Sequence, residues 1–289
     1  MPEFAGIITE PGLYPDVPED QYHADPVQGG SLSVSGAKLL LQAPAKYDYA
    51  RHHPHKSTKA MDKGTVTHGF VLGTGPEVVE IKFDDWRTKA AQAERDNAIE
   101  HGLVPMLRKD YAECRAIADA VLRHPTAGGL FTEGDAEVSM FWRDLEFGIW
   151  CRGRADYMTY FGETPTIVDF KTTADASAEE FARSVYKYGY HRQDPHYCEG
   201  WAAILGCDPG EIDFVFVAVE TEPPYCLAQY RVKAEHAELG RQQNRIARER
   251  FRDCVKHDVW PGYSEEIEDL ELPRYGVQRI EKDINEWFR

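Results

Sequence analysis

The segment 166–172 constrains the fold more than any other part of the chain, because it sets two charges into an apolar run. Alternate residues of a strand share a face, so Asp169 and Lys171 point to one side while their neighbours point into a core. Buried charges are costly unless they are paired. The segment therefore predicts a half-buried strand that presents an acid and a lysine together.

Other segments of strand-like length are rich in Val, Ile, Phe, Tyr and Trp, which predicts a sheet. They cover 136–142, 147–160, 212–219 and 226–232. Helical spacing and end signals predict helices over about 60–72, 87–101, 110–123, 177–189, 194–205 and 234–256. Capping patterns mark helix starts at Ser33 or Ser35, at Asp110 with Glu113, and at Ser177 with Glu180. We expect one α/β domain whose first 130 residues are mainly helical.

Composition narrows the class of protein. A chain of 289 residues with 42% hydrophobic and 12% aromatic residues can bury a large core, which excludes general disorder. Subtracting 49 acidic from 33 basic residues gives a net charge of −16, which argues against a protein that coats nucleic acid nonspecifically. No apolar run approaches the roughly 18 residues of a membrane helix, and the N-terminus lacks signal-peptide features. We expect a cytoplasmic protein with no membrane partner.

Asp156 lies in the segment before the one that carries Asp169. If the two segments form neighbouring strands, these carboxylates can come close together. Two carboxylates at one point repel each other unless a cation lies between them, and hard oxygen ligands favour Mg²⁺ or Mn²⁺ over zinc. Lys171 could then hold an attacking water or stabilise charge on a phosphate oxygen. For a DxK pattern taken alone, a salt-bridged pair on a half-exposed sheet is the better interpretation.

Further candidates lie far apart in the sequence. His68 falls on a predicted short helix, and Glu137 opens a predicted strand. Gln193 and Tyr197 are four residues apart and share a helix face. Pro195 lies between them, which a helix tolerates only in its first turn. Taken singly, each of these residues also fits a structural role.

In chain order these residues form the series GTVTH (64–68), Glu137, GRAD (153–156), VDFKT (168–172) and QDPHY (193–197). The series resembles the PD-(D/E)xK nuclease superfamily in its RecB-like branch. It is most similar to the RecE-like (exonuclease VIII) exonuclease domains of phage and prophage recombination systems. The segments SLSVSGAKLLLQAPAKY and VWPGY are also similar to that group, and the resemblance covers about residues 30–265.

The resemblance implies a restriction-endonuclease-like α/β core with a mixed central sheet flanked by helices. It implies Mg²⁺-dependent 5′→3′ degradation of linear double-stranded DNA by a homo-oligomeric ring in the bacterial host cell, with Mn²⁺ able to substitute. The 3′ single-stranded overhangs would serve recombination with a RecT-like single-strand annealing protein.

The resemblance also implies roles for particular positions. The implied metal ligands are His68, Asp156 and Asp169, and the implied catalytic lysine is Lys171. Glu137 would be an acidic catalytic residue near the metals, and Gln193 and Tyr197 would line the catalytic site. In the expected mechanism, the lysine and one metal hold the attacking water, and a second metal or the same one stabilises the leaving oxygen.

DNA contacts are expected where basic residues gather. The segment 38–68 holds six Lys and Arg residues against two acids, although a merely solvated charged face is the alternative. The residues expected to contact DNA are Ser35, Lys38, Arg51, Lys56, Lys63 and Arg192.

Three parts of the chain are expected: an irregular arm over 1–30, the exonuclease domain over 31–265, and an acidic tail or helix over 266–289. Other functions remain open on the same fold. A non-catalytic recombination scaffold would bind DNA ends without cleaving them, and a metal-dependent endonuclease would cut closed circular DNA. A hydrolase of small phosphoesters has no specific support in the sequence.

Overall fold

The computed structural model describes residues 1–53 and 63–288. Within these residues, strands form a seven-stranded sheet in the order β1-β5-β6-β7-β8-β9, and β2 pairs with β6. The β7–β8 and β2–β6 pairs are parallel and the other pairs antiparallel, which confirms the expected mixed sheet. The strands are β1 (Gly12–Tyr14), β2 (Ser31–Leu32), β5 (Gly134–Asp144), β6 (Ile149–Phe161), β7 (Thr164–Thr173), β8 (Asp213–Glu220) and β9 (Leu227–Tyr230).

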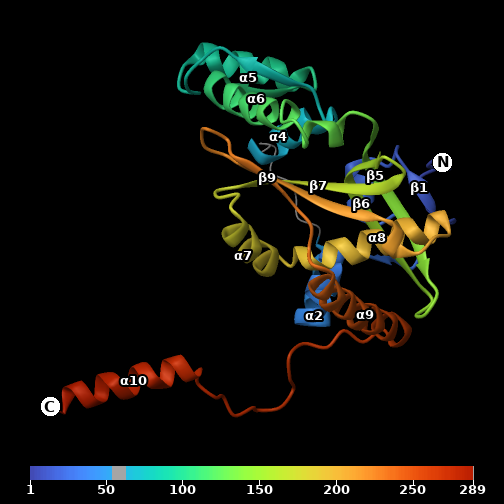
Figure 1. Cartoon of the computed structure of the whole chain (residues 1–289), viewed down its shortest axis with the longest axis vertical. Helices are drawn as coiled ribbons and strands as arrows, with labels where there is room; N and C mark the ends of the chain where they lie inside the picture. The colour runs from blue at the N-terminus through green and yellow to red at the C-terminus, as the bar shows by residue number, and fades with distance from the viewer. Residues whose placement is uncertain (54–62, 289) are drawn as a thin grey trace.

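Helices cover both faces of the sheet (Figure 1). One layer contains α4 (Lys63–Leu72), α5 (Lys89–Glu100) and α6 (Arg108–Leu122), with a small parallel sheet of β3 (Val78–Ile81) and β4 (Val104–Leu107). The other contains α2 (Val34–Gln42), α3 (Pro44–His52), α7 (Ala178–Tyr188), α8 (Gln193–Leu205) and α9 (Ala234–His257). The predicted helices are therefore confirmed within the described residues, and the N-terminal part is mainly helical, but the sequence did not indicate β3 and β4.

The alternation of side chains along β7 divides the core in two. Val168 and Phe170 pack on the side of α4 and α6, whereas Ile167 packs on the side of α8 and α9. Asp169 and Lys171 share the face of Ile167, because alternate residues of a strand point the same way. The predicted strand and its charged face are therefore present.

Residues 1–30, predicted as an irregular arm, contain one short strand and one short helix and pack on the body of the protein. β1 pairs with β5, and α1 (Glu19–Ala24) follows it. Tyr14, Tyr22 and Val27 are buried in one cluster with aromatic side chains of β5 and β6. These apolar residues are too widely spaced to form a periodic pattern, so only the tertiary structure reveals that the segment completes the sheet.

The observed N-terminal cap agrees with the sequence prediction for one helix and differs from it for two. Ser33 caps α2, accepting a backbone N–H three residues later at 3.1 Å. The other two predicted capping boxes are wrong, because neither α6 nor α7 has a side-chain cap. Asp110 and Glu113 instead form ion pairs with Lys63 at 2.6 and 2.5 Å, so contacts between α4 and α6 replace the local ones.

The C-terminal end of the chain leaves the body of the protein. Residues 258–273 form no helix or strand, and α10 (Arg274–Trp287) stands apart from the sheet and its layers (Figure 1). A helix therefore occupies most of the segment predicted as an acidic tail or helix. No helix in the described part of the chain is both long and apolar enough to cross a membrane.

Candidate active site

Three acids occupy facing positions on three neighbouring strands. Tyr157 of β6 pairs with Val168 of β7, so the residues one step further, Asp156 and Asp169, fall opposite each other. In the β5–β6 ladder, the pairs on either side of Glu137 place it opposite Asp156 as well. The sheet therefore sets one carboxylate from each of β5, β6 and β7 in a row, which includes the predicted approach of the two aspartates.

The alternation of β5 and β6 is interrupted at these acids. In a regular strand, the residues before and after a given position share a face. Here Ala136 packs with one core and Val138 with the other, and Ala155 and Tyr157 are divided in the same way. Glu137 has a left-handed φ of 55°, which costs a non-glycine residue about 1–2 kcal/mol. Backbone strain of this kind is concentrated at functional positions.

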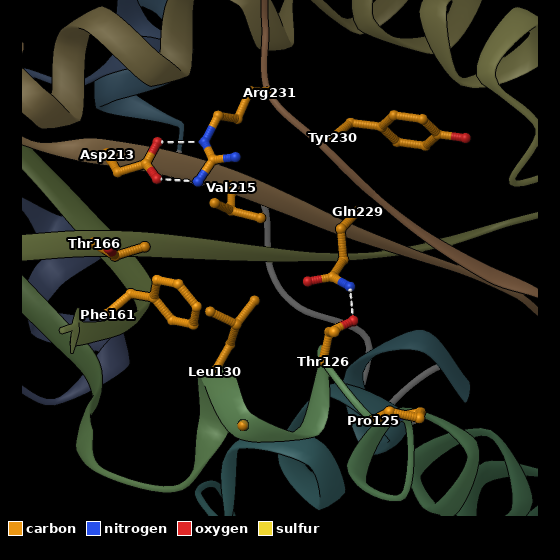
Figure 2. Close-up of a pocket in the computed structure, with 11 residues that line it drawn as sticks. Pro125, Thr126, Leu130, Phe161, Thr166, Asp213, Val215, Gln229, Tyr230 and Arg231 are labelled. Carbon is orange, nitrogen blue, oxygen red and sulfur yellow. Dashed lines mark hydrogen bonds and ion pairs between the residues drawn. The ribbon is translucent and has the colours of Figure 1, made fainter. Parts of the chain in front are cut away.

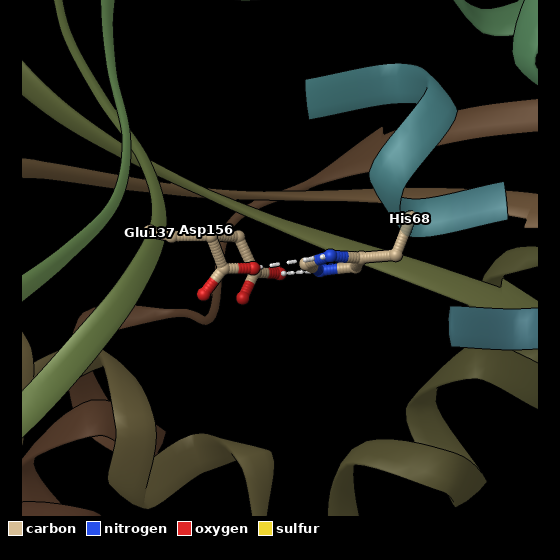
Figure 3. A group of neighbouring side chains, drawn as sticks. All are labelled: His68, Glu137 and Asp156. Atoms are coloured by element: carbon tan, nitrogen blue, oxygen red, sulfur yellow. Dashed lines mark ion pairs between the residues drawn. The ribbon is translucent and has the colours of Figure 1, made fainter. Parts of the chain in front are cut away.

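His68 reaches the row of acids from α4, as Figure 3 shows. Its Nε2 lies 3.0 Å from Asp156 Oδ2, and its Nδ1 lies 3.3 Å from Glu137 Oε1. Burial acts to lower the pKa of His68, but the two carboxylates outweigh burial and raise the pKa to about 10. The charged imidazole therefore offsets part of the negative charge of the acids.

Asp169 and Lys171 form a buried pair, with side chains 2% and 20% exposed. Lys171 Nζ contacts Asp169 Oδ2, and Gln193 Nε2 donates a hydrogen bond to Asp169 Oδ1 at 3.3 Å. Burial raises the pKa of Asp169 to about 6, with Lys171 opposing this rise and Asp156 adding to it. The pKa of Lys171 is raised by the same two acids against the effect of burial, so the ammonium stays charged.

Asp156 is held in place from two strands and a helix. Its Oδ2 accepts the backbone N–H of Phe170 at 2.8 Å, in addition to the contact with His68. Burial acts to raise the pKa of Asp156, yet the charges of Lys171 and His68 keep it below its usual value. Asp156 is therefore an ionised carboxylate with a fixed orientation.

The site offers a suitable donor set for a metal ion. One ligand atom from each of His68, Glu137 and Asp156 lies within 4.8 Å of the others. Carboxylate oxygens are the ligands that Mg²⁺ and Mn²⁺ prefer, so the residues fit the expected metal. The structure groups Glu137 with the predicted ligands His68 and Asp156, whereas the predicted ligand Asp169 is bound to Lys171 at the next position of the row.

The comparisons with known proteins agree with this arrangement. Residues 33–273 match the family described as "PDDEXK-like domain of unknown function (DUF3799)". The chain belongs to this family. It is therefore a member of the PD-(D/E)xK superfamily, as its sequence series predicted, whereas the closer RecE-like assignment stays a prediction.

Solved structures resemble this PDDEXK-like protein in fold. The crystal structure of a candidate exonuclease from Eubacterium rectale is 15% identical, with a TM-score of 0.57 over 85% of this chain and 91% of that chain. The crystal structure of SSO0001 is 11% identical, with a TM-score of 0.26 over 63% of this chain and 84% of that chain, which is too low to indicate a shared fold. No curated protein matches the sequence. The first likeness confirms the fold.

Gln193 and Tyr197, the predicted pair on α8, differ in their contacts: one binds an acid of the site and the other packs in the core. Gln193 binds Asp169, as described above, so it belongs to the site. Tyr197 is buried beneath it, and a Cβ added to Gly153 would lie 2.8 Å from the tyrosine ring. Tyr197 therefore packs on the strand that carries the acids. Pro195 falls in the first turn of α8, where its missing N–H removes no helical hydrogen bond.

Lys38 is the predicted DNA contact that the structure brings toward the site. Its Nζ donates a hydrogen bond to the carbonyl of Tyr188 at 3.4 Å. The ring of Tyr188 stacks on that of Tyr190, and the Tyr190 ring centroid lies 5.1 Å from Lys171 Nζ. The sequence did not indicate this tyrosine pair, and no motif in it marks the pair.

The other residues predicted to contact DNA have different surroundings. Lys63 forms its two ion pairs with α6, and Arg51 pairs with an acid of its own helix at 2.9 Å. Arg192 is buried, and its guanidinium donates to a glutamine of α9, so its side chain is already engaged within the protein. Ser35 is exposed at the start of α2, and Lys56 lies outside the described residues.

A separate pocket of about 430 Å³ lies near the starts of β7 and β8 (Figure 2). Its wall includes the ion pair of Arg231 with Asp213 and a hydrogen bond from Gln229 to Thr126 at 2.5 Å. None of the residues that line it belongs to the row of acids. The candidate active site is therefore distinct from this pocket.

Proposed function

We propose that this chain is a metal-dependent deoxyribonuclease that degrades linear double-stranded DNA from its ends. The observation that carries the proposal is the row of Glu137, Asp156 and Asp169, with Lys171 against the last of them. Metal-dependent hydrolysis of a phosphodiester uses clustered carboxylates to hold the metal ions, and a charged donor beside the phosphate stabilises the transition state. A purely structural Asp–Lys pair would have no need of two further acids and His68 at the same point.

The residues divide the chemical work among them. Mg²⁺, or Mn²⁺ in its place, would be held by His68, Glu137 and Asp156, and when bound it would offset their charge and polarise a phosphate oxygen. Lys171 Nζ orients the attacking water and stabilises negative charge that develops on the phosphate. Asp169 positions Lys171, and the hydrogen bond from α8 positions Asp169 in turn.

The resemblance to RecE-like exonucleases extends the proposal to the direction of digestion, the partner protein and the oligomeric assembly. The sequence series is similar to RecE-like exonucleases, and the similar Eubacterium rectale protein is itself described as a candidate exonuclease. On this basis the chain would digest 5′→3′ as a homo-oligomeric ring in a bacterial cytoplasm. It would leave 3′ single-stranded overhangs for a RecT-like annealing protein.

Digestion of a linear duplex labelled separately at each 5′ and 3′ end tests the proposal, with a closed circle of the same sequence alongside. We expect Mg²⁺ to release the 5′ label first, the circle to stay intact, and EDTA to stop the reaction. Asp169→Asn should lose the activity. Cutting of the circle would identify an endonuclease instead. DNA binding without any Mg²⁺-dependent cleavage would identify a non-catalytic scaffold and refute the proposal.

A further inference from the structure

Helix α10 carries an apolar stripe that contacts no other part of the described chain. Val277, Ile280, Ile284 and Trp287 recur at spacings of three and four residues, which puts them on one helix face. The side chains of the two isoleucines are 48% and 49% exposed, and that of the tryptophan is 86% exposed. A lone helix of 14 residues is marginally stable in water, so packing of this stripe against another apolar surface would stabilise α10.

Acidic residues border the stripe. At 3.6 residues per turn, Glu281 lies on one side of it and Asp283 on the other. Lys282 lies on the opposite face, whereas Arg279 lies one turn before Asp283 and Arg274 lies close to the Glu281 edge. The surface that α10 offers to a partner is therefore apolar along its centre, with one acid and one arginine near each edge.

An apolar groove with basic edges lies on the body of the protein. It has a volume of about 780 Å³ and runs between α7 and α9, beside the end of β9. Its apolar lining includes Val185, Leu239 and Ile246, and the latter two are 56% and 45% exposed. Lys233 and His236 also line it. The groove thus matches the stripe of α10 in polarity, and Lys233 places a positive charge at its rim.

The connection between α9 and α10 is long enough for α10 to reach well beyond the body of its own chain. Trp260 stacks on Tyr47 with 5.5 Å between ring centroids, and Pro261 accepts a backbone hydrogen bond from Ala45 at 3.0 Å. The chain is therefore fixed to the body up to this point. The residues 262–273 that follow span at most about 40–43 Å when extended, and α10 adds about 21 Å.

We infer that the α7–α9 groove is the docking site for α10 of a second copy of this chain. In the structure α10 projects away from its own body on an extended connection (Figure 1). The α7–α9 groove of the same chain is open. A helix and a complementary groove on one chain generate either a reciprocal dimer or a closed ring. This inference goes beyond the proposed nuclease activity and does not depend on it.

Light scattering of the full chain, without DNA or metal, tests the docking. We expect the wild type to contain two or more copies. Ile284→Glu on α10 and Leu239→Glu in the groove should each raise the dissociation constant at least about tenfold, because each puts a charge where an apolar side chain is buried. Gln278→Glu adds the same group to the other side of α10 and should assemble like the wild type. Circular dichroism confirms that each variant is folded.

Mixing the two defective variants distinguishes docking between two chains from docking of α10 into the groove of its own chain. Ile284→Glu keeps an intact groove and Leu239→Glu keeps an intact α10, so the mixture should assemble although neither variant does so alone. A monomeric wild type, variants that assemble like the wild type, or a mixture that stays monomeric would each overturn the inference. A monomeric wild type would also contradict the proposed ring. None of these results bears on DNA cleavage itself, so the docking and the nuclease activity can fail separately.

Discussion

Lys171→Met removes the cation that compensates two buried carboxylates of the candidate active site. Lys171 Nζ contacts Asp169 and lies in the field of Asp156 as well. Methionine has a similar length and no charge, so the variant isolates the loss of the ammonium. His68 continues to balance Asp156 from α4, whereas Asp169 is left with one hydrogen bond from Gln193.

The expected magnitude follows from the burial of the pair. Removing one partner of a buried ion pair costs about 3–5 kcal/mol, and the 20% exposure of the Lys171 side chain favours the lower end. A loss of about 3 kcal/mol lowers the melting temperature of a chain of this size by roughly 6–12 °C. DNA cleavage should fall by about 10²–10³, the usual effect of losing one charged donor.

Metal dependence distinguishes an active site from a structural ion pair. Mg²⁺ stabilises whichever folded form binds it, and without Lys171 the buried Asp169 carboxyl group has to bind either a proton or a cation. Scanning calorimetry should therefore show a larger Mg²⁺-dependent rise in melting temperature for Lys171→Met than for the wild type. Lys187→Met, which removes an exposed lysine of α7, is the matched control and should behave like the wild type. Wild-type cleavage by Lys171→Met, or no response of its stability to Mg²⁺, would refute the reasoning.

Three further predictions concern the scaffold of the site. Gly153→Ala should lower the free energy of unfolding by about 1–3 kcal/mol in urea, because the new Cβ meets the ring of Tyr197; no loss would show that the ring moves freely. Glu137→Gly should be more stable than Glu137→Ala by about 1 kcal/mol in the same assay, because both lack the carboxylate and glycine alone accepts a φ of 55° without strain. Burial lowers the pKa of His196 to about 3, against roughly 6.5 when unfolded, so its neutral ring contributes stability that is lost as the pH falls below about 6.5. An NMR titration should show this ring still neutral at about pH 5, and protonation near pH 6.5 would contradict the account.

The centre of the site was predictable because it depends on local pattern. Alternation along 166–172 placed Asp169 and Lys171 on one face, and an antiparallel neighbour brought Asp156 within reach. The strands β5 to β9 and most helices could be predicted for the same reason, since each buries one face with a regular period. These features need no knowledge of distant parts of the chain.

The remaining features depend on contacts between distant segments. Glu137 faces Asp156 only through the register of β5 with β6, and its left-handed backbone has no sequence marker. His68 reaches both acids because α4 packs over the sheet. Lys63 draws two acids of α6 away from the capping role that local sequence favoured. The sparse apolar residues of 1–30 find their partners only in the assembled sheet.

In the proposed function, the row of acids is the centre of a metal-dependent nuclease, and Asp156 stands in the middle of that row. The most direct test compares nucleotide release from linear duplex DNA by the wild type and Asp156→Asn across one Mg²⁺ titration. Asp84→Asn, an exposed acid outside the site, serves as the control. The account predicts Mg²⁺-dependent release by the wild type and the control, and release at least about 100-fold slower by Asp156→Asn. Equal rates for all three, or release that does not require a divalent metal, would contradict it.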